Sequence, residues 1–114
     1  MTKAELKEWA PLCEEWDDLC RRIRELESKA VSGRSKVRTE AALQRFRALR
    51  DGVNSEIVKI EAAVDSLPSV ERRLIVLRYC EGLSWRKIAV DLGFSVDHVG
   101  GALHRRALKL LAGL

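Results

Sequence analysis

The sequence has no long apolar run, few aromatic residues, two prolines and three cysteines among its 114 residues. Because no run approaches the ~20 apolar residues that a bilayer span requires, we expect no membrane contact. The first ten residues, MTKAELKEWA, contain no unbroken apolar stretch, so we expect no secretion signal and a cytoplasmic protein in a bacterial cell. In that compartment an odd number of cysteines indicates reduced thiols rather than a disulfide framework.

Helix-forming residues are what the sequence has in abundance. Charged residues make up 33% and apolar residues 46%, which excludes a disordered chain. A chain this rich in Ala, Leu, Glu, Lys and Arg, with few helix breakers, is predicted to be all-α. The net charge is +4. Residues 1–66 carry 13 basic and 13 acidic side chains, whereas residues 67–114 carry 8 basic and 4 acidic ones. A positive field confined to one part of a chain favours a polyanion such as nucleic acid as the partner.

Residues 1–66 show the apolar spacing of two long helices. Apolar side chains recur at alternating steps of three and four, which is the seam of a helix packing lengthwise on another. The seams are interrupted around Gly33 in residues 31–36, so we predict a long antiparallel helical hairpin with its connection there. The first seam consists of Leu6, Trp9, Cys13, Trp16, Cys20, Ile23 and Ala30, and the second of Leu43, Phe46, Val53, Ile57, Ile60, Val64 and Leu67.

Pro11 lies within the first predicted helix. A proline inside a helix removes one backbone hydrogen bond, and its ring collides with the preceding turn. The helix therefore either kinks between Lys7 and Ala10, which we favour, or begins at Pro11. Thr2 and Glu5 have the spacing of a capping box at the start of the chain.

A hairpin of two helices is too thin to cover apolar stripes this wide. The stripes must dock either against the C-terminal part of the chain or against a second copy, and we favour a homodimer. Trp9 and Trp16 also suggest a ligand-stacking pair, but their helical spacing on an apolar face favours core packing. Cys13 and Cys20, with no histidine near them in sequence, are small seam fillers rather than metal ligands.

Residues 67–114 are predicted to form a three-helix domain. Pro68 suits the first turn of a helix that carries Val70, Leu74 and Leu77 toward Gly82. Ser84 is an N-cap for a two-turn helix over residues 85–92, with Ile88, Ala89 and Leu92 facing inward, and Gly93 supplies a turn. Ser95 caps a third helix, with Val99, Ala102 or Leu103, and Leu110 toward the core. Two short helices joined at a glycine describe a helix-turn-helix.

The spacing of these residues resembles region 4 of bacterial sigma factors, in which Leu-Pro and Glu-Arg precede a helix ending Leu-Arg-Tyr, followed by a glycine and a helix-turn-helix. The matching residues are Leu67, Pro68, Glu71, Arg72, Leu77, Arg78, Tyr79 and Gly82, and then Ile88, Ala89, Leu92, Gly93, Ser95, Val99, Leu103, Arg105 and Ala107. Together with the hairpin, the chain is similar to small sigma-like regulators of phages and prophages. The sigma regions that bind the polymerase clamp and melt promoter DNA have no counterpart, so we do not expect a complete sigma factor.

The resemblance implies that the third helix lies in the major groove of double-stranded DNA. It assigns base-facing positions to Ser95, Val96, Asp97, His98, Gly100, Gly101 and His104. Arg86 and Lys87 near the start of the second helix, with Arg105 and Arg106 at the far end of the third, are expected to contact phosphates. The ring of Trp85 is expected to lie on a sugar or against the hairpin.

Gly100 and Gly101 depart from the sigma pattern, because long polar side chains usually stand at these two positions. Adjacent glycines weaken the helix by roughly 2 kcal/mol relative to alanines. They also present no donors to base edges. Readout then rests on the remaining polar side chains, or the helix has lost sequence reading and serves protein contact.

Three functions remain open from the sequence. The favoured one is a DNA-binding transcription regulator, phage or prophage encoded. The alternatives are a module that binds RNA polymerase or another protein without reading DNA, and a recognition subunit for phage DNA packaging. We expect no enzyme and no cofactor or metal, because the sequence shows no phosphate-binding glycine loop or nucleophile motif, and the histidines, His98 and His104, do not have metal-ligand spacing.

Overall fold

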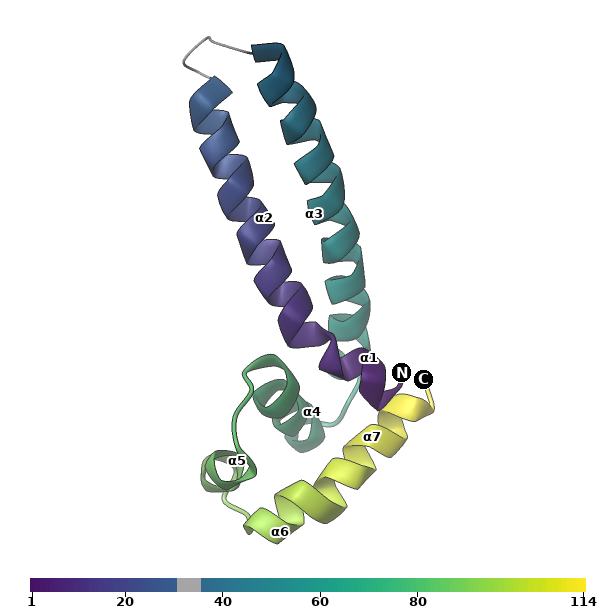
Figure 1. The fold of residues 1–114 in the computed structure, drawn as a ribbon. Helices are drawn as coiled ribbons and strands as arrows, with labels where there is room; N and C mark the ends of the chain where they lie inside the picture. The colour runs from purple at the N-terminus through teal and green to yellow at the C-terminus, as the bar shows by residue number, and fades with distance from the viewer. Residues whose placement is uncertain (31–35) are drawn as a thin grey trace. The chain divides into compact units, whose positions relative to one another are not determined.

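In the computed structural model of the protein, residues 1–30 and 36–114 are described, and every element in these ranges is helical (Figure 1). The elements are α1 (Lys3–Lys7), α2 (Trp9–Ala30), α3 (Lys36–Asp65), α4 (Ser69–Ile75), the π-helical turn η1 (Val76–Cys80), α5 (Trp85–Leu92), α6 (Val96–His98), the π-helical turn η2 (Val99–Leu103) and α7 (His104–Ala112). The prediction of an all-α chain is confirmed. The predicted connection at residues 31–36 lies, except for Lys36, outside the described residues. None of the described helices has an apolar stretch long enough to cross a bilayer.

The described chain divides into two units. One consists of Leu12–Ile57, which contains most of α2 and α3, and the other combines Met1–Pro11 with Val58–Leu114. The N-terminal helix α1 and the end of α3 thus belong to the same unit as the helices from α4 to α7. The predicted division into domains of residues 1–66 and 67–114 stays a prediction.

The first unit is an antiparallel pair of helices (Figure 1). Leu19 of α2 and Val53 and Ile57 of α3 are buried together, with Leu12, Cys13 and Phe46 packed against them. Cys13, Phe46, Val53 and Ile57 of this cluster lie on the predicted seams, so the predicted hairpin is confirmed. Trp16 is an exception, because 36% of it is exposed although it lies on the predicted seam. Leu49 of α3 is 51% exposed.

The break near Pro11 lies where the kink was expected. The capping box starts α1, with the Glu5 N–H donating to Thr2 Oγ1 at 3.2 Å and the Thr2 N–H to Glu5 Oε1 at 3.3 Å. Helix α1 ends at Lys7, the chain turns at Glu8, and α2 begins at Trp9. Pro11 is therefore in the first turn of α2, where a backbone N–H has no partner within the helix and its loss costs little.

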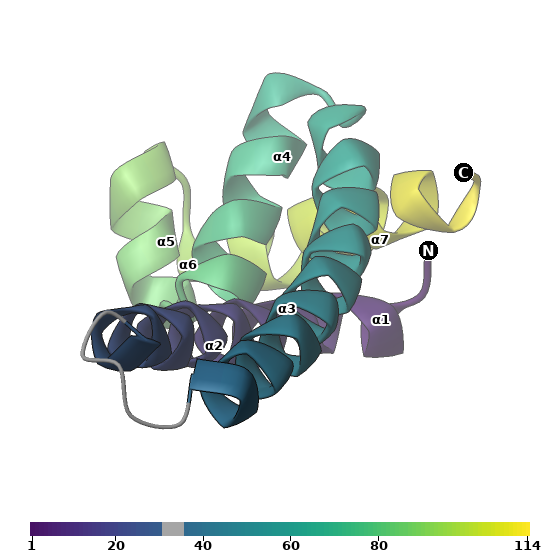
Figure 2. The same ribbon diagram turned by 90° about the horizontal axis from the view of Figure 1, so that it is seen from above.

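The second unit buries apolar side chains from most of its helices, the exceptions being η1 and α6. Its buried side chains are Leu6, Trp9, Ile60, Val64, Leu67, Leu74, Ile75, Ile88, Ala89, Val99, Leu103, Ala107 and Leu111. The chain ends meet in this unit, because the N-terminal ammonium donates to the Leu111 carbonyl at 2.9 Å, and both views show the N and C labels side by side (Figure 2). The expected inward positions of Val70 and Leu110 are wrong, since both are exposed, and Glu71 and Leu111 are buried instead.

Candidate nucleic-acid interface

Two serine caps and one glycine build the helix-turn-helix. Ser84 Oγ accepts from the Lys87 N–H at 3.3 Å and fixes the start of α5. Gly93 ends α5 with a φ of +75°, a left-handed conformation that other residues adopt at a cost. Ser95 Oγ then accepts from the His98 N–H at 3.2 Å and caps α6, which starts at Val96. The two helices predicted to meet at Gly93 are confirmed.

α6, η2 and α7 form one continuous helix, because the backbone stays right-handed helical through Val99, Leu103 and His104. We call it the recognition helix. Its inner side is buried at Val99, Leu103, Ala107 and Leu111, which are each four residues apart. In an α-helix of 3.6 residues per turn, residues spaced by four do not stay on one face, because four residues exceed one full turn. The π-helical turn contains more residues per turn and so keeps residues spaced by four closer to one face. Leu111 is therefore buried in place of Leu110.

The outer side of the recognition helix carries most of the expected base-facing residues. Ser95, Val96, Asp97 and His98 are exposed, and the His98 ring lies edge-on to Phe94 with centroids 5.0 Å apart. A Cβ added at Gly101 meets no described atom within 4 Å, apart from the backbone of its own helix. These positions are open to a ligand, and their contact with bases stays a prediction.

Gly100 and His104 lie on the inner flank of the recognition helix rather than its outer side. A Cβ at Gly100 comes within 3.4 Å of the Trp85 ring. Only 8% of His104 is exposed, its Nε2 is 2.7 Å from the Tyr79 hydroxyl, and its ring centroid lies 4.7 Å from that of Trp85. Gly100 has no side chain and faces the Trp85 ring, and the His104 ring is held inside the fold, so neither residue is placed to reach a base edge.

The four expected phosphate contacts divide into two groups. Arg86 and Lys87 in the first turn of α5 and Arg105 on the recognition helix are exposed. The Arg106 side chain is also exposed, at 70%, but its Nε lies 3.4 Å from Oε1 of Glu71, a residue that is only 5% exposed. A buried carboxylate without a partner is strongly destabilising, so Arg106 supports the packing of α7 on α4. Phosphate contact by these residues stays a prediction.

The ring of Trp85 is held by neighbours on two helices, and its expected contact with a sugar stays a prediction. Its ring packs within its own unit, between Gly100 and His104 on one helix and Arg78 on another. The Arg78 guanidinium carbon lies 4.4 Å from the ring centroid, and its Nη1 donates to the Leu83 carbonyl at 3.0 Å. The arrangement joins the start of α5 to the middle of the recognition helix, which fixes the angle between them.

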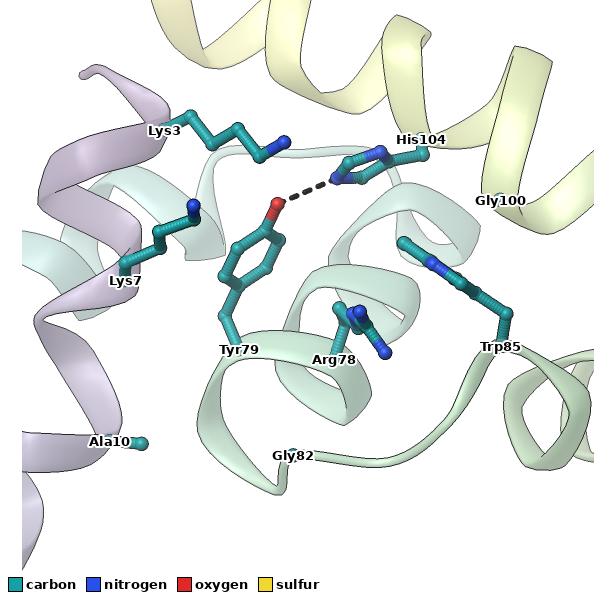
Figure 3. A pocket seen from close by; sticks show the side chains of 9 residues that line it. All are labelled: Lys3, Lys7, Ala10, Arg78, Tyr79, Gly82, Trp85, Gly100 and His104. Atoms are coloured by element: carbon teal, nitrogen blue, oxygen red, sulfur yellow. Dashed lines mark hydrogen bonds between the residues drawn. The ribbon is translucent and has the colours of Figure 1, made fainter.

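Trp85 also lines a cavity of about 630 Å³, to which α1, the start of α2, η1, Gly82 and the recognition helix contribute (Figure 3). We call it the basic pocket; its lining residues are Lys3, Lys7, Ala10, Arg78, Tyr79, Gly82, Trp85, Gly100 and His104. Burial lowers the pKa of His104 below its ordinary value of 6.5, and the charges of Lys3 and Arg78 lower it further. Burial raises the pKa of Tyr79, against a smaller opposite effect of Arg78.

Sequence reasoning missed the basic pocket. The four-residue spacing of Lys3 and Lys7 indicates one face of a helix, but nothing in the spacing indicates that α1 packs near Tyr79. That proximity arises from the tertiary packing of α1 with the end of the chain, where the N-terminal ammonium bonds to Leu111.

Comparison with known proteins supports the helix-turn-helix. Residues 57–111 match the family model described as Sigma-70, region 4. No curated protein and no solved structure matches the chain. The matched residues run from the end of α3 through α7 and so include both helices of the candidate interface.

Proposed function

Residues 57–111 form a sigma-70 region 4-like helix-turn-helix, and from this premise we propose that the chain is a transcription regulator that places helix 95–111 in the major groove of DNA. DNA binding and a role in transcription are common to this type of domain. One observation carries the finer proposal. The first turns of α5 and of the recognition helix expose cationic and polar side chains, while the opposite sides of both helices are buried.

The geometry suggests that α5 and the recognition helix contact different parts of the DNA. Arg86 and Lys87 lie at the N-terminal end of α5, where unpaired backbone N–H groups also attract an anion. They would hold a phosphate and set the register without reading sequence. Asp97 and His98 in the first turn of the recognition helix would meet base edges, with Asp97 accepting from a cytosine amino group. Gly101 would allow the backbone to approach the groove closely.

We further propose that the chain acts as a homodimer and is phage or prophage encoded. The exposed Trp16 and Leu49 on the hairpin unit support the first part, because they leave apolar surface for a second copy to cover. The second part rests on the resemblance of a hairpin joined to a sigma-like helix-turn-helix. The proposal assigns no catalytic step and no cofactor to the chain.

Paired variants in the two helices test the proposal. Arg86→Ala should weaken binding to selected and random duplexes alike and lower the slope of log affinity against log salt by about 0.9, which is one phosphate contact. His98→Ala should relax the preference at one base position and leave the slope unchanged. The measurement is selection of bound sequences from random duplexes, followed by fluorescence anisotropy across salt concentrations.

Lys36→Ala is the matched control for this experiment, because it removes one exposed positive charge from the start of α3. It should leave both the slope and the selected sequence unchanged. If Arg86→Ala and His98→Ala affect specific and random DNA equally, the assigned roles are wrong. If the wild type is not retained by any duplex in dilute buffer, DNA binding itself is wrong.

A second function, binding of RNA polymerase without reading DNA, is favoured by a different observation. Val90 of α5 is 81% exposed, and Phe94 and Val96 beside the turn are also exposed. Neighbouring exposed apolar side chains are typical of a protein contact. Three results together would decide for this function. Wild type captures purified core polymerase, the Val90→Lys variant does not, and wild type gives no DNA shift at low salt.

A further inference from the structure

The basic pocket gathers positive charge that no acidic side chain of its described lining offsets. Lys3 and Lys7 stand four residues apart on α1, and both side chains extend toward the hydroxyl of Tyr79 (Figure 3). Like charges at this helical spacing repel and destabilise a helix. The fold adds Arg78 to the same concavity, so the repulsion is a feature of the tertiary structure as well as of α1.

Two polar groups of the pocket, on Arg78 and Tyr79, are held in place, so the pocket differs from a face formed by the exposed Lys3 and Lys7 alone. The Arg78 guanidinium is fixed by the Leu83 carbonyl and by the Trp85 ring. The Tyr79 hydroxyl is fixed by its 2.7 Å hydrogen bond to His104. Rigid donors lose little side-chain entropy on binding, so they favour a ligand over water.

We propose that the basic pocket is an anion site that binds a phosphate group through Lys3, Lys7 and Arg78. Ammonium and guanidinium groups form charge-assisted hydrogen bonds with phosphate oxygens. The cavity of about 630 Å³ is large enough for a phosphate with an attached group. The phosphate comes from one of two sources, the backbone of a bound duplex or a free phosphate compound.

The site extends beyond the helix-turn-helix, because Lys3 and Lys7 lie outside the residues that match sigma region 4. If the phosphate belongs to a bound duplex, α1 adds contacts with the DNA backbone to those of the helix-turn-helix. If it belongs to a free phosphate compound, the pocket couples a small anion to the position of Trp85, and through Gly100 to the recognition helix. Binding of a free phosphate does not depend on the proposed DNA-binding function.

The first part of the test uses inorganic phosphate and pyrophosphate on the full chain at constant ionic strength. NMR signals of His104 report on the pocket, and those of the exposed His98 serve as the reference in the same sample. Pyrophosphate should shift the His104 signals, and Lys3→Ala/Lys7→Ala should weaken that binding by about tenfold. Lys36→Ala/Lys59→Ala removes the same charge outside the pocket lining and should leave the binding unchanged.

The second part measures the salt dependence of DNA binding for the same variants. If the phosphate belongs to the duplex, Lys3→Ala/Lys7→Ala should lower the slope of log affinity against log salt by about one to two. The Lys36→Ala/Lys59→Ala control should keep the wild-type slope.

Each result decides the proposal. A specific pyrophosphate shift with an unchanged slope identifies a free phosphate as the ligand, and a changed slope identifies the DNA backbone. If pyrophosphate leaves His104 unmoved and the slope is unchanged, the site does not exist. If wild type binds no DNA at all, the transcription proposal fails, and the pyrophosphate result alone decides on the pocket.

Discussion

The protonation state of His104 links the pocket to the stability of the fold. Its pKa is lowered by burial and by the nearby charges of Lys3 and Arg78, so the folded protein favours the neutral ring. The unfolded chain then binds more protons than the folded one as the pH falls below about 6.5. The contribution of His104 to stability is therefore present above that pH and is lost progressively on acidification.

We predict that His104→Asn changes the pH dependence of unfolding. Wild type should be more stable than the variant at pH 7.5, because the variant loses ring packing against Tyr79 and Trp85. The difference in stability should shrink as the pH is lowered to 5, because protonation of the ring destabilises folded wild type and the variant has no such ring. Urea denaturation of both proteins across this range provides the measurement, and a difference that is constant with pH would contradict the prediction.

The two adjacent glycines of the recognition helix have different surroundings, which gives a second prediction. Gly101→Ala should raise the free energy of unfolding by about 0.5–1 kcal/mol, since it adds helix propensity in open space. Gly100→Leu should instead lower it, because a Cβ there already lies 3.4 Å from the Trp85 ring and the larger side chain overpacks this contact. Thermal denaturation of the two variants checks the sign of each effect. Equal stabilisation by both would show that Trp85 is not packed there.

Single residues were predictable where their role depends on near neighbours. The caps at Thr2, Ser84 and Ser95 satisfy backbone groups three residues away, so the local sequence is sufficient. Gly100 and His104 were misplaced because their direction depends on the π-helical turn η2, which changes the rotation along the recognition helix. Such a turn has no sequence signal comparable to a cap.

At the scale of elements, the start of the recognition helix depends on the Ser95 cap. Ser95→Ala should lower the free energy of unfolding by about 1 kcal/mol, because the His98 N–H loses its partner. Ser95→Asp keeps the cap and should retain stability, but its negative charge should weaken DNA binding. Urea denaturation and fluorescence anisotropy on the same samples separate the two effects. An alanine variant as stable as wild type would show that the cap contributes nothing.

Helix positions and ends followed from the sequence more closely than helix contacts did. The three-four spacing of α2 and α3 predicted the hairpin, and Pro11 predicted the break before α2. The grouping of α1 with the helix-turn-helix was not predicted. It depends on contacts between chain ends about 110 residues apart, such as Met1 with Leu111, which local patterns do not encode.

For the whole molecule, the proposed dimer would bring two recognition helices to one duplex. Linked binding sites gain affinity through effective concentration, provided that the linkage lets both engage at once. The hairpin unit exposes apolar side chains of the kind that an interface between copies covers, at Trp16 and Leu49. Oligomeric state and DNA affinity should therefore change together.

We predict that Leu49→Lys disrupts this assembly. Wild type should sediment as two chains of 12.9 kDa each, and the variant as one, because a charge in an apolar interface is costly to bury. Duplex affinity should fall with the loss of the second site, while the helical circular dichroism per residue stays unchanged. Val37→Lys, at a residue of α3 that is 83% exposed, is the matched control and should remain dimeric. A monomeric wild type, or a Leu49→Lys dimer with full affinity, would contradict the prediction and leave the exposed hairpin side chains without a partner.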